Sequence, residues 1–181
     1  IPHAAVVVAD CINNGAVTAM GELPSAVGGI AGNIGRPVRV RGCINNGKVS
    51  FEGVSPRKRS SAGGIVGQIY TTKSQSAAAY VRDCVNHGFV SAGAGGNNQT
   101  GNNAIHAGGV VGFANIREGL LCYIKDNSND GRVLASSGRK GNICGYVSQN
   151  VKTGGSAADD YAVPAAVAAD GANVFGMVRT S

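Results

Sequence analysis

Cysteines at one repeated position are the first residues of this sequence that could do chemistry. Cys11, Cys43 and Cys84 follow one another at spacings of 32 and 41 residues, in closely similar surroundings. Thiolates bind soft metals, but no two cysteines are separated by two residues, and a column of thiols cannot surround a metal ion tetrahedrally. The five cysteines are an odd number, and the pairing of Cys122 and Cys144 stays open. We interpret the repeated cysteines as buried free thiols that act as small apolar side chains, without metal or cofactor.

Asparagines recur in the same way and form a second candidate group. The repeated positions are Asn13, Asn45, Asn86 and Asn129. Aligned amides could bind a ligand, but such columns usually bond along themselves and to turn backbone, which satisfies buried polar groups. We therefore interpret the asparagine column as structural.

The acidic residues and histidines predict neither a metal site nor catalysis. Asp10, Asp83 and Asp126 share one repeat position, but Gly42 interrupts them, which argues against a ladder of calcium-binding loops. His87 replaces an Asn or Asp of the other copies, so we expect a solvent-facing turn residue. The sequence has no nucleophile elbow, no zinc-protease helix motif and no phosphate-binding loop. We expect no catalytic residues and no enzymatic activity.

Two further motifs favour a surface role. Arg57, Lys58 and Arg59 form the one dense basic cluster and predict a clamp for a carboxylate, sulfate or phosphate on an anionic partner, against the alternative of a solvated loop. Asn98 begins an Asn-Gln-Thr glycosylation acceptor, which matters only if the protein is eukaryotic and secreted.

These residues sit in an internal repeat. Four segments share the pattern V-x-[DG]-C-x-N-x-G-x-V, with the fourth carrying Asn127 in place of cysteine. They are residues 8–17, 40–49, 81–90 and 124–133. A second element, Gly-Gly-[Ile/Val]-x-Gly, begins at Gly28, Gly63 and Gly108, and weaker copies stand at 141–145 and 172–176. The chain is therefore a tandem array.

Each copy predicts a strand, a turn and a strand. Valine, cysteine and isoleucine alternate with polar residues, which indicates half-buried strands. The Asn-x-Gly step predicts a tight bend through a positive φ, which glycine adopts freely. Such a unit cannot bury its own apolar face, so copies must stack about 4.8 Å apart with like residues aligned. We predict an all-β fold, a β-solenoid (β-helix) of about four to five stacked repeats with an irregular C-terminal segment.

Composition supports this fold. Glycine makes up 29 of 181 residues, charged residues only 14%, and tryptophan is absent, which excludes a disordered polyelectrolyte, a charged coiled coil and a long-helix protein. The net charge is +6, but the basic residues are scattered and few aromatics lie among them, so we expect no nucleic acid. No apolar run is long enough to span a bilayer, so we expect no membrane insertion by this segment.

The repeats assign residues 1–150 to the array and residues 151–181 to an atypical last repeat or cap of the same domain.

The glycine element at residues 28–32, followed by residues 43–49, resembles the GLUG-type repeats of bacterial surface proteins and adhesins. Such repeats also occur beside the catalytic region of some IgA-specific metallopeptidases. The resemblance covers roughly residues 5–150, with Ile or Val in place of the leucine of the Gly-Leu-x-Gly core. It implies a β-solenoid at an extracellular or cell-surface location and transfers no catalytic residue.

The leading hypothesis is a non-enzymatic extracellular repeat module that presents loops for cell-surface adhesion or recognition of a glycan or protein. One alternative is a structural surface protein that self-associates head-to-tail into filaments. A second alternative is a β-helix enzyme or binding module for acidic polysaccharide, which the basic charge balance permits.

Overall fold

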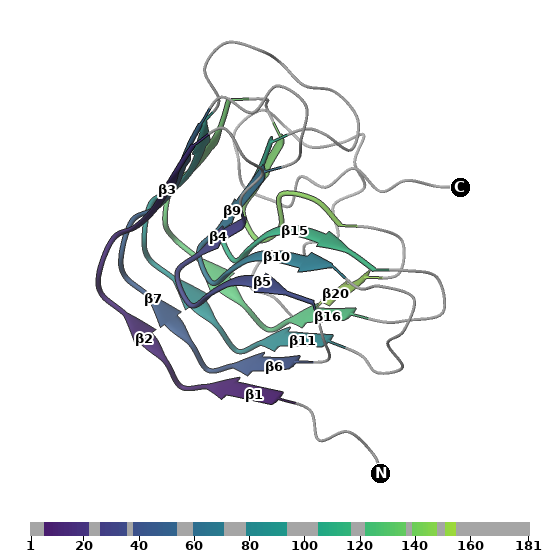
Figure 1. The fold of residues 1–181 in the computed structure, drawn as a ribbon. Coiled ribbons are helices and arrows are strands. Elements are labelled where there is room, and N and C mark those ends of the chain that lie inside the picture. The colour runs from purple at the N-terminus through teal and green to yellow at the C-terminus, as the bar shows by residue number, and fades with distance from the viewer. Residues whose placement is uncertain are drawn as a thin grey trace.

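The described part of the chain is built from strands alone. The computed structural model describes residues 6–21, 26–35, 38–53, 60–70, 79–93, 105–116, 122–136, 139–147 and 151–154. Every regular element within these ranges is a β-strand, and the strands pair in parallel in five sheets (Figure 1). The prediction of an all-β, repeat-stacked fold is confirmed.

The five sheets, named A to E in the order in which the chain visits them, have the following strands. Sheet A contains β1 (Val6–Ala9), β6 (Val38–Arg41), β11 (Ala79–Arg82), β16 (Cys122–Lys125) and β20 (Val151–Gly154). Sheet B contains β2 (Ile12–Asn13), β7 (Ile44–Asn45), β12 (Val85–Asn86) and β17 (Ser128–Asn129). Sheet C contains β3 (Val17–Met20), β8 (Val49–Glu52), β13 (Val90–Gly93) and β18 (Val133–Ala135). Sheet D contains β4 (Ala26–Gly28), β9 (Ser60–Gly63), β14 (Ile105–Gly108) and β19 (Arg139–Gly141). Sheet E contains β5 (Ala31–Ile34), β10 (Val66–Tyr70) and β15 (Val111–Asn115).

One sequence repeat makes one coil of the solenoid. Coil 1 runs through β1–β5, coil 2 through β6–β10, coil 3 through β11–β15 and coil 4 through β16–β19, closed by bridges from Val111 to Cys144 and from Ala114 to Val147. Strand β20 pairs with β16 and begins a fifth coil, so the array continues to Gly154. The remainder of the C-terminal segment, residues 155–181, lies outside the described residues.

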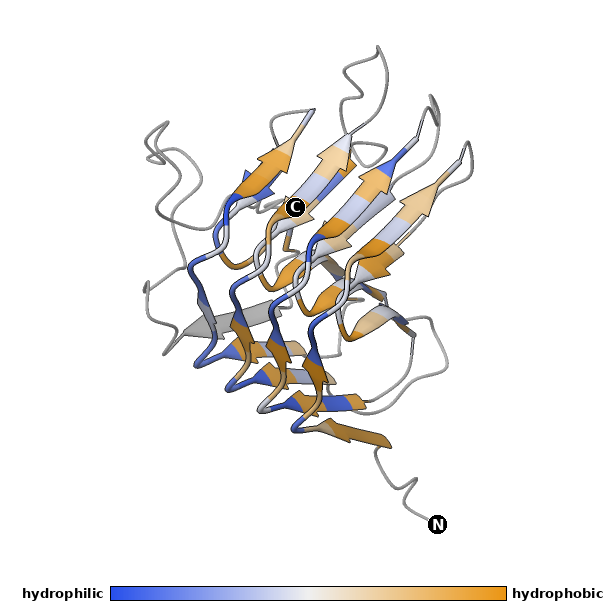
Figure 2. Ribbon diagram, turned by 90° about the vertical axis from the view of Figure 1, so that its left-hand side faces the viewer, coloured by the Kyte–Doolittle hydropathy of each residue, from blue (hydrophilic) through white to orange (hydrophobic). Residues whose placement is uncertain are grey.

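Register follows the repeat alignment residue by residue. In sheet A, Val8 pairs with Val40, Val40 with Val81, and Val81 with Ile124. These valines point inward, and Val40 and Val81 are fully buried. Their neighbours in the chain alternate outward, as expected for strands with one buried face. Figure 2 shows that apolar and polar segments recur at the same place in successive coils.

The interior is divided into two apolar cores, which the repeat pattern did not predict. The first joins sheets A and E, around Val40, Ile69 and Ile124. The second joins sheets C and D, around Phe51 and Ile105. Sheet D lies between sheets C and E, and all four residues of β9 and of β14 are buried. The coil therefore folds back on itself at sheet D and does not enclose a single prism.

The bend prediction for Asn-x-Gly is wrong in its backbone detail. Among the described residues, positive φ within the repeat falls on Asp10 (55°), Gly42 (61°), Asp83 (54°) and Asp126 (55°), and not on the glycine of Asn-x-Gly. These four residues stand at the corner between sheets A and B, where the chain passes from one strand to the next. Aspartate and glycine alternate there because both enter the left-handed region at lower cost than most residues.

The repeated glycines are instead required by close approach between coils. A Cβ at Gly47 would overlap the carbonyl oxygen of Gly15, and a Cβ at Gly88 would overlap that of Gly47. The second glycine of the Gly-Gly-[Ile/Val]-x-Gly element is crowded in a different way. A Cβ at Gly64 would overlap the side chain of Asn86 and the backbone of Gly109. The two sequence elements of the repeat are therefore the two sides of one contact.

Candidate functional site

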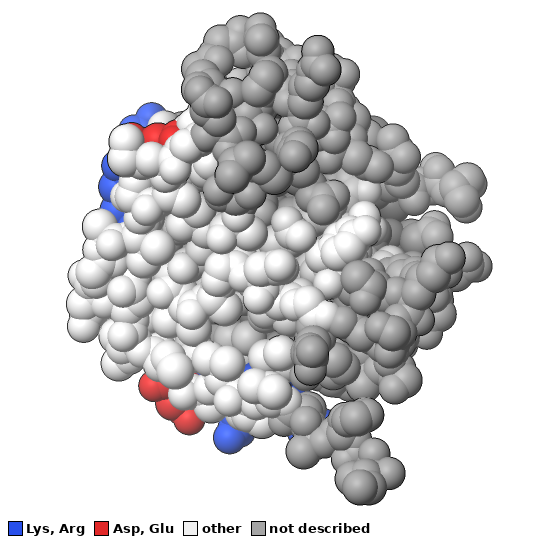
Figure 3. Space-filling model, in the orientation of Figure 1, with Lys and Arg blue, Asp and Glu red and all other residues white. Residues whose placement is uncertain are grey.

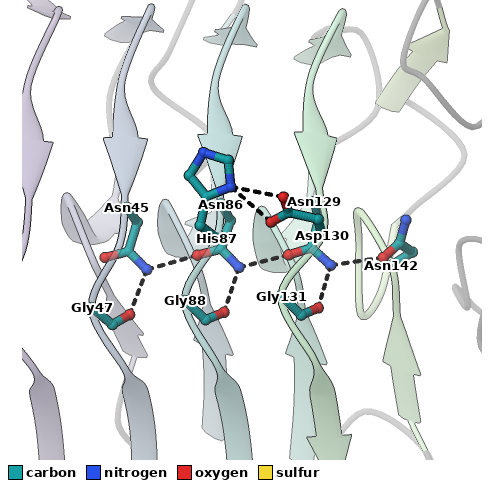
Figure 4. A network of polar contacts seen from close by, with 9 residues as sticks. All are labelled: Asn45, Gly47, Asn86, His87, Gly88, Asn129, Asp130, Gly131 and Asn142. Carbon is teal, nitrogen blue, oxygen red and sulfur yellow. Dashed lines mark hydrogen bonds and ion pairs between the residues drawn. The ribbon is translucent and has the colours of Figure 1, made fainter.

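A hydrogen-bonded asparagine ladder runs along the solenoid. The amide nitrogen Nδ2 of Asn13 donates to Oδ1 of Asn45 at 2.7 Å, Asn45 donates to Asn86 at 2.7 Å, and Asn86 donates to Asn129 at 2.6 Å. Each Nδ2 also donates, at 2.8 Å, to the carbonyl oxygen two residues later in its own turn (Figure 4). Asn45 and Asn86 have no exposed surface. Every rung is thus satisfied by the next coil and by its own turn, and these amides are committed to structure.

The ladder ends on a residue that does not belong to sheet B but to the turn between sheets D and E. Asn129 donates to Oδ1 of Asn142 at 2.7 Å. Asn142 stands at the turn between sheets D and E, in register with the crowded glycines Gly64 and Gly109. In coil 4 its side chain takes the position that a fifth asparagine of sheet B would occupy. Sequence reasoning missed this role, although the change from glycine to asparagine at that repeat position was its signal.

The cysteines form a column beside this ladder at the corner between sheets A and B. Cys11 is exposed, contrary to the expectation of a buried thiol, whereas Cys43 and Cys84 are fully buried as expected. Each thiol donates to the carbonyl oxygen two residues earlier, at 3.2 to 3.3 Å. Burial raises the pKa of Cys43, and it raises the pKa of Cys84 to about 12. Buried, protonated thiols of this kind are poor nucleophiles and poor metal ligands.

Asn127, which replaces the fourth cysteine, is held by the preceding coil. Its Oδ1 accepts from the backbone N–H of Cys84 at 3.0 Å, and its Nδ2 donates to the carbonyl of Val81 at 3.0 Å. The side chain is 1% exposed. An amide here replaces a thiol by making two hydrogen bonds, which a buried polar group requires.

All five cysteines are free, including Cys122 and Cys144, whose pairing the sequence left open. Burial raises the pKa of the Cys122 thiol to about 12. Within the described ranges, no group of three or more histidine, cysteine or acidic side chains is arranged to hold a metal ion. In the same part of the chain, no helix is long and apolar enough to cross a membrane.

His87 lies in a second, exposed column at the turn between sheets B and C. Asn46 donates to Asn14 at 2.7 Å, and Nδ1 of His87 lies 2.8 Å from a carboxylate oxygen of Asp130. The column joins neighbouring coils by polar contacts at the surface. The side chains of this column, including those of His87 and Asp130, are exposed.

The outer face of sheet A carries basic and aromatic side chains in two columns, which we name the sheet A face. The first column is Arg39, Tyr80 and Tyr123, and the second is Arg41, Arg82 and Lys125. Sequence reasoning missed this face because its members stand on separate repeats and differ in residue type. The signal was the alternation of outward basic or aromatic residues with inward valines in each copy.

The basic cluster Arg57–Arg59 and the glycosylation acceptor Asn98 lie outside the described residues. Both belong to the segments that join sheet C to sheet D, in coils 2 and 3. Their roles stay predictions.

Comparisons with family models, with curated proteins and with solved structures gave no match to this chain.

Proposed function

We propose that this chain is a non-enzymatic, extracellular repeat module that presents recognition segments from a rigid solenoid. The observation that supports it is where the length of the repeat varies. The turns from A to B, B to C and D to E have the same length in every coil. The segments from sheet C to sheet D have 4, 6, 11 and 2 residues outside the described ranges, and those from sheet E to the next sheet A have 2, 8, 5 and 3. Variation is confined to two corners.

This division matches a scaffold with two variable edges. The asparagine ladder beside the fixed turns is hydrogen-bonded between coils and within each turn, so its buried amides are committed to structure. Segments of variable length that follow a rigid strand are where repeat proteins commonly carry recognition. The basic cluster Arg57–Arg59 and the 11-residue segment 94–104 belong to the same corner. A surface location, and a partner that is a glycan or a protein of the cell surface, are part of this proposal, as is the resemblance to GLUG-type repeats.

The test is binding by the folded chain to a glycan array and to whole cells. Two variants address the corner between sheets C and D: replacement of segment 94–104 by the shorter 22–25, and Arg57→Ser combined with Lys58→Ser and Arg59→Ser. We expect binding by the parent chain and reduced binding by at least one variant at an unchanged melting temperature. A folded parent chain that binds nothing on the array and no cells contradicts the proposal.

Self-association is the second candidate, and the exposed edge of coil 1 favours it. Four large apolar side chains of this coil are exposed: Val6 (59%), Val7 (53%), Ile12 (61%) and Met20 (77%). The coil 2 counterparts of Val6 and Ile12, which are Val38 and Ile44, are half-buried, whereas those of Val7 and Met20 are the exposed polar residues Arg39 and Glu52. Unpaired parallel strands with apolar side chains are templates for further strands. Sedimentation across a concentration series, with Ile12→Lys as the edge-blocking variant, tests this candidate. Assembly that the variant abolishes supports it, and a monomer at all concentrations excludes it.

A further inference from the structure

The sheet A face has a regular spacing that the side chains of a single loop cannot have. Each coil contributes one residue to each of the two columns, so successive side chains of a column stand about 4.8 Å apart along the solenoid axis. The second column places Arg41, Arg82 and Lys125 one above another, and all three are exposed. A ligand that fits this face must be extended and must repeat along its own length.

The aromatic groups of the face are held as a stack. The rings of Tyr80 and Tyr123 lie 5.0 Å apart, centre to centre, with an angle of 10° between their planes. The guanidinium of Arg39 lies 5.7 Å from the centre of the Tyr80 ring, and Nζ of Lys125 lies 5.5 Å from that of Tyr123. Cations at these distances are attracted by the ring faces. The stack therefore has positive charge beside it, and its ring faces are turned toward one another along the axis.

Carboxylates form a third row beside the basic one. Asp10, Asp83 and Asp126 stand at the corner between sheets A and B, each with the positive φ that turns the chain there. Nε of Arg82 donates to Oδ2 of Asp83 at 2.7 Å, and the pKa of Arg82 is raised by this hydrogen bond and by the charge of Asp83. Gly42 contributes no carboxylate of its own to the row, and Oδ1 of Asp10 lies where it would crowd a Cβ at Gly42. Figure 3 shows acidic and basic side chains side by side at the lower edge of the molecule.

We propose that the sheet A face binds a linear acidic polysaccharide laid along the solenoid axis. Carboxylate or sulfate groups of the sugar chain pair with Arg39, Arg41 and Lys125. Sugar hydroxyls donate to the carboxylates of the neighbouring acidic row and hydrogen-bond to the two phenol groups. The proposal rests on the proposed recognition function and places the ligand on a sheet face, away from the variable corners.

The same geometry disfavours nucleic acid. Protein surfaces that bind single strands offer aromatic ring faces on which bases stack. Here the two tyrosine rings stack on each other, with Arg39 and Lys125 beside them. Sugar hydroxyls can donate hydrogen bonds to the carboxylates of Asp83 and Asp126, whereas the phosphodiester groups of a nucleic acid backbone offer no donor to them.

The decisive experiment measures affinity for a polyuronate and a sulfated polysaccharide, with single-stranded DNA of similar length as the competing polyanion. The face variant is Arg39→Ser with Arg41→Ser. The control is Lys48→Ser with Arg132→Ser, which removes the same charge from exposed residues at the corner between sheets B and C. We expect the face variant to lose about 10- to 100-fold in affinity and the control to lose less than about threefold. Tyr80→Phe, which keeps the ring stack, should lose a few-fold with an unchanged melting temperature.

Each other outcome overturns the proposal in a distinct way. Equal losses in the face and control variants would show general attraction by net charge. Tighter binding of DNA than of either polysaccharide would exclude the ligand class. Binding that the 94–104 replacement abolishes and the face variant leaves intact would move the site to the corner and keep the proposed function. Absence of polysaccharide binding, with cells or other glycans still bound, would likewise overturn only the inference about this face.

Discussion

Coil 1 and coil 3 carry the same motif residues in the same register and differ in what precedes them. Cys84, Asn86 and Gly88 of coil 3 are covered by coil 2, whereas Cys11 and Gly15 of coil 1 are exposed at the end of the described stack. A Cβ at Gly88 would overlap the carbonyl of Gly47, but a Cβ at Gly15 would meet only Oδ1 of Asn13, at 3.8 Å. The residues of the repeat motif are therefore selected for close packing against the preceding coil. In coil 1, where no preceding coil is described, Cys11 and Gly15 are exposed and are not packed in this way.

The largest difference is expected at the turn glycine. Gly88→Ala should destabilise the fold by at least about 3 kcal/mol, or prevent folding, because two stretches of backbone must separate. Gly15→Ala should cost less than about 1 kcal/mol. Neither glycine has a positive φ, so the comparison isolates close approach from backbone strain. Urea unfolding of both variants measures it, and similar costs at the two positions would refute the account of the glycines.

The asparagine ladder should show the next largest difference. Asn86→Ala removes one accepted and two donated hydrogen bonds from a site without exposed surface, and we expect a loss of about 3 kcal/mol. Asn13 is partly exposed, and among the described residues its Oδ1 accepts from the N–H of Gly15, at 3.1 Å. Asn13→Ala should cost about 1 kcal/mol. The midpoints of denaturant unfolding decide between this ranking and equal effects, and equal effects would mean that the ladder does not act through its buried rungs.

Asn127 sharpens the comparison by testing a departure from the motif. Asn127→Cys restores the residue of the other three coils, yet it removes the bonds to the N–H of Cys84 and the carbonyl of Val81. We expect a loss of about 1 to 2 kcal/mol. Thermal unfolding of the variant and of the parent chain under the same conditions measures this loss of stability. A gain in stability would show that the cysteine column matters more than the two hydrogen bonds.

The smallest effect concerns the thiols. Cys11 should react with a thiol reagent at neutral pH, whereas Cys84 and Cys122 should not, because burial raises the pKa of each to about 12. The raised pKa values also predict that stability falls as the pH rises from about 9 toward 12, since the unfolded thiols ionise first. Mass spectrometry after timed labelling identifies the modified cysteine. Labelling of Cys84 as fast as Cys11 would contradict the burial of coil 3.

Much of the fold could be predicted because a stacked repeat converts sequence alignment into spatial register. Aligning Asn45 with Asn86 was enough to place them on adjacent rungs. The folding back of sheet D was not predictable in this way. Its residues, such as Ser61 and Ala62, are small, and all four residues of β9 are buried. Their sequence therefore has no alternation of apolar and polar residues that would indicate which sheet they pack against. The division into two cores follows from that packing.

The site was harder to predict than the fold for three physical reasons. The alternation of Asp83 with Gly42 is the usual sign of a left-handed backbone position, but it was interpreted only as an argument against a ladder of calcium-binding loops. The sheet A face joins Arg39 and Tyr80, which are far apart in the sequence and dissimilar in type, so a search for like residues passes over them. Asn142 was missed because it accepts the hydrogen bond of Asn129 from the turn between sheets D and E, and not from the repeat position of the other asparagines.

Distances along one outward column test the stacking most directly. Spin labels on Ile12 paired in turn with Ile44, Val85 and Ser128 would sample successive rungs of sheet B. The background is Cys11→Ser, which leaves only buried native thiols. We predict mean separations that rise in even steps of about 4.8 Å across the series. Separations that rise unevenly, or a shorter distance to Ser128 than to Val85, would contradict a solenoid in this register.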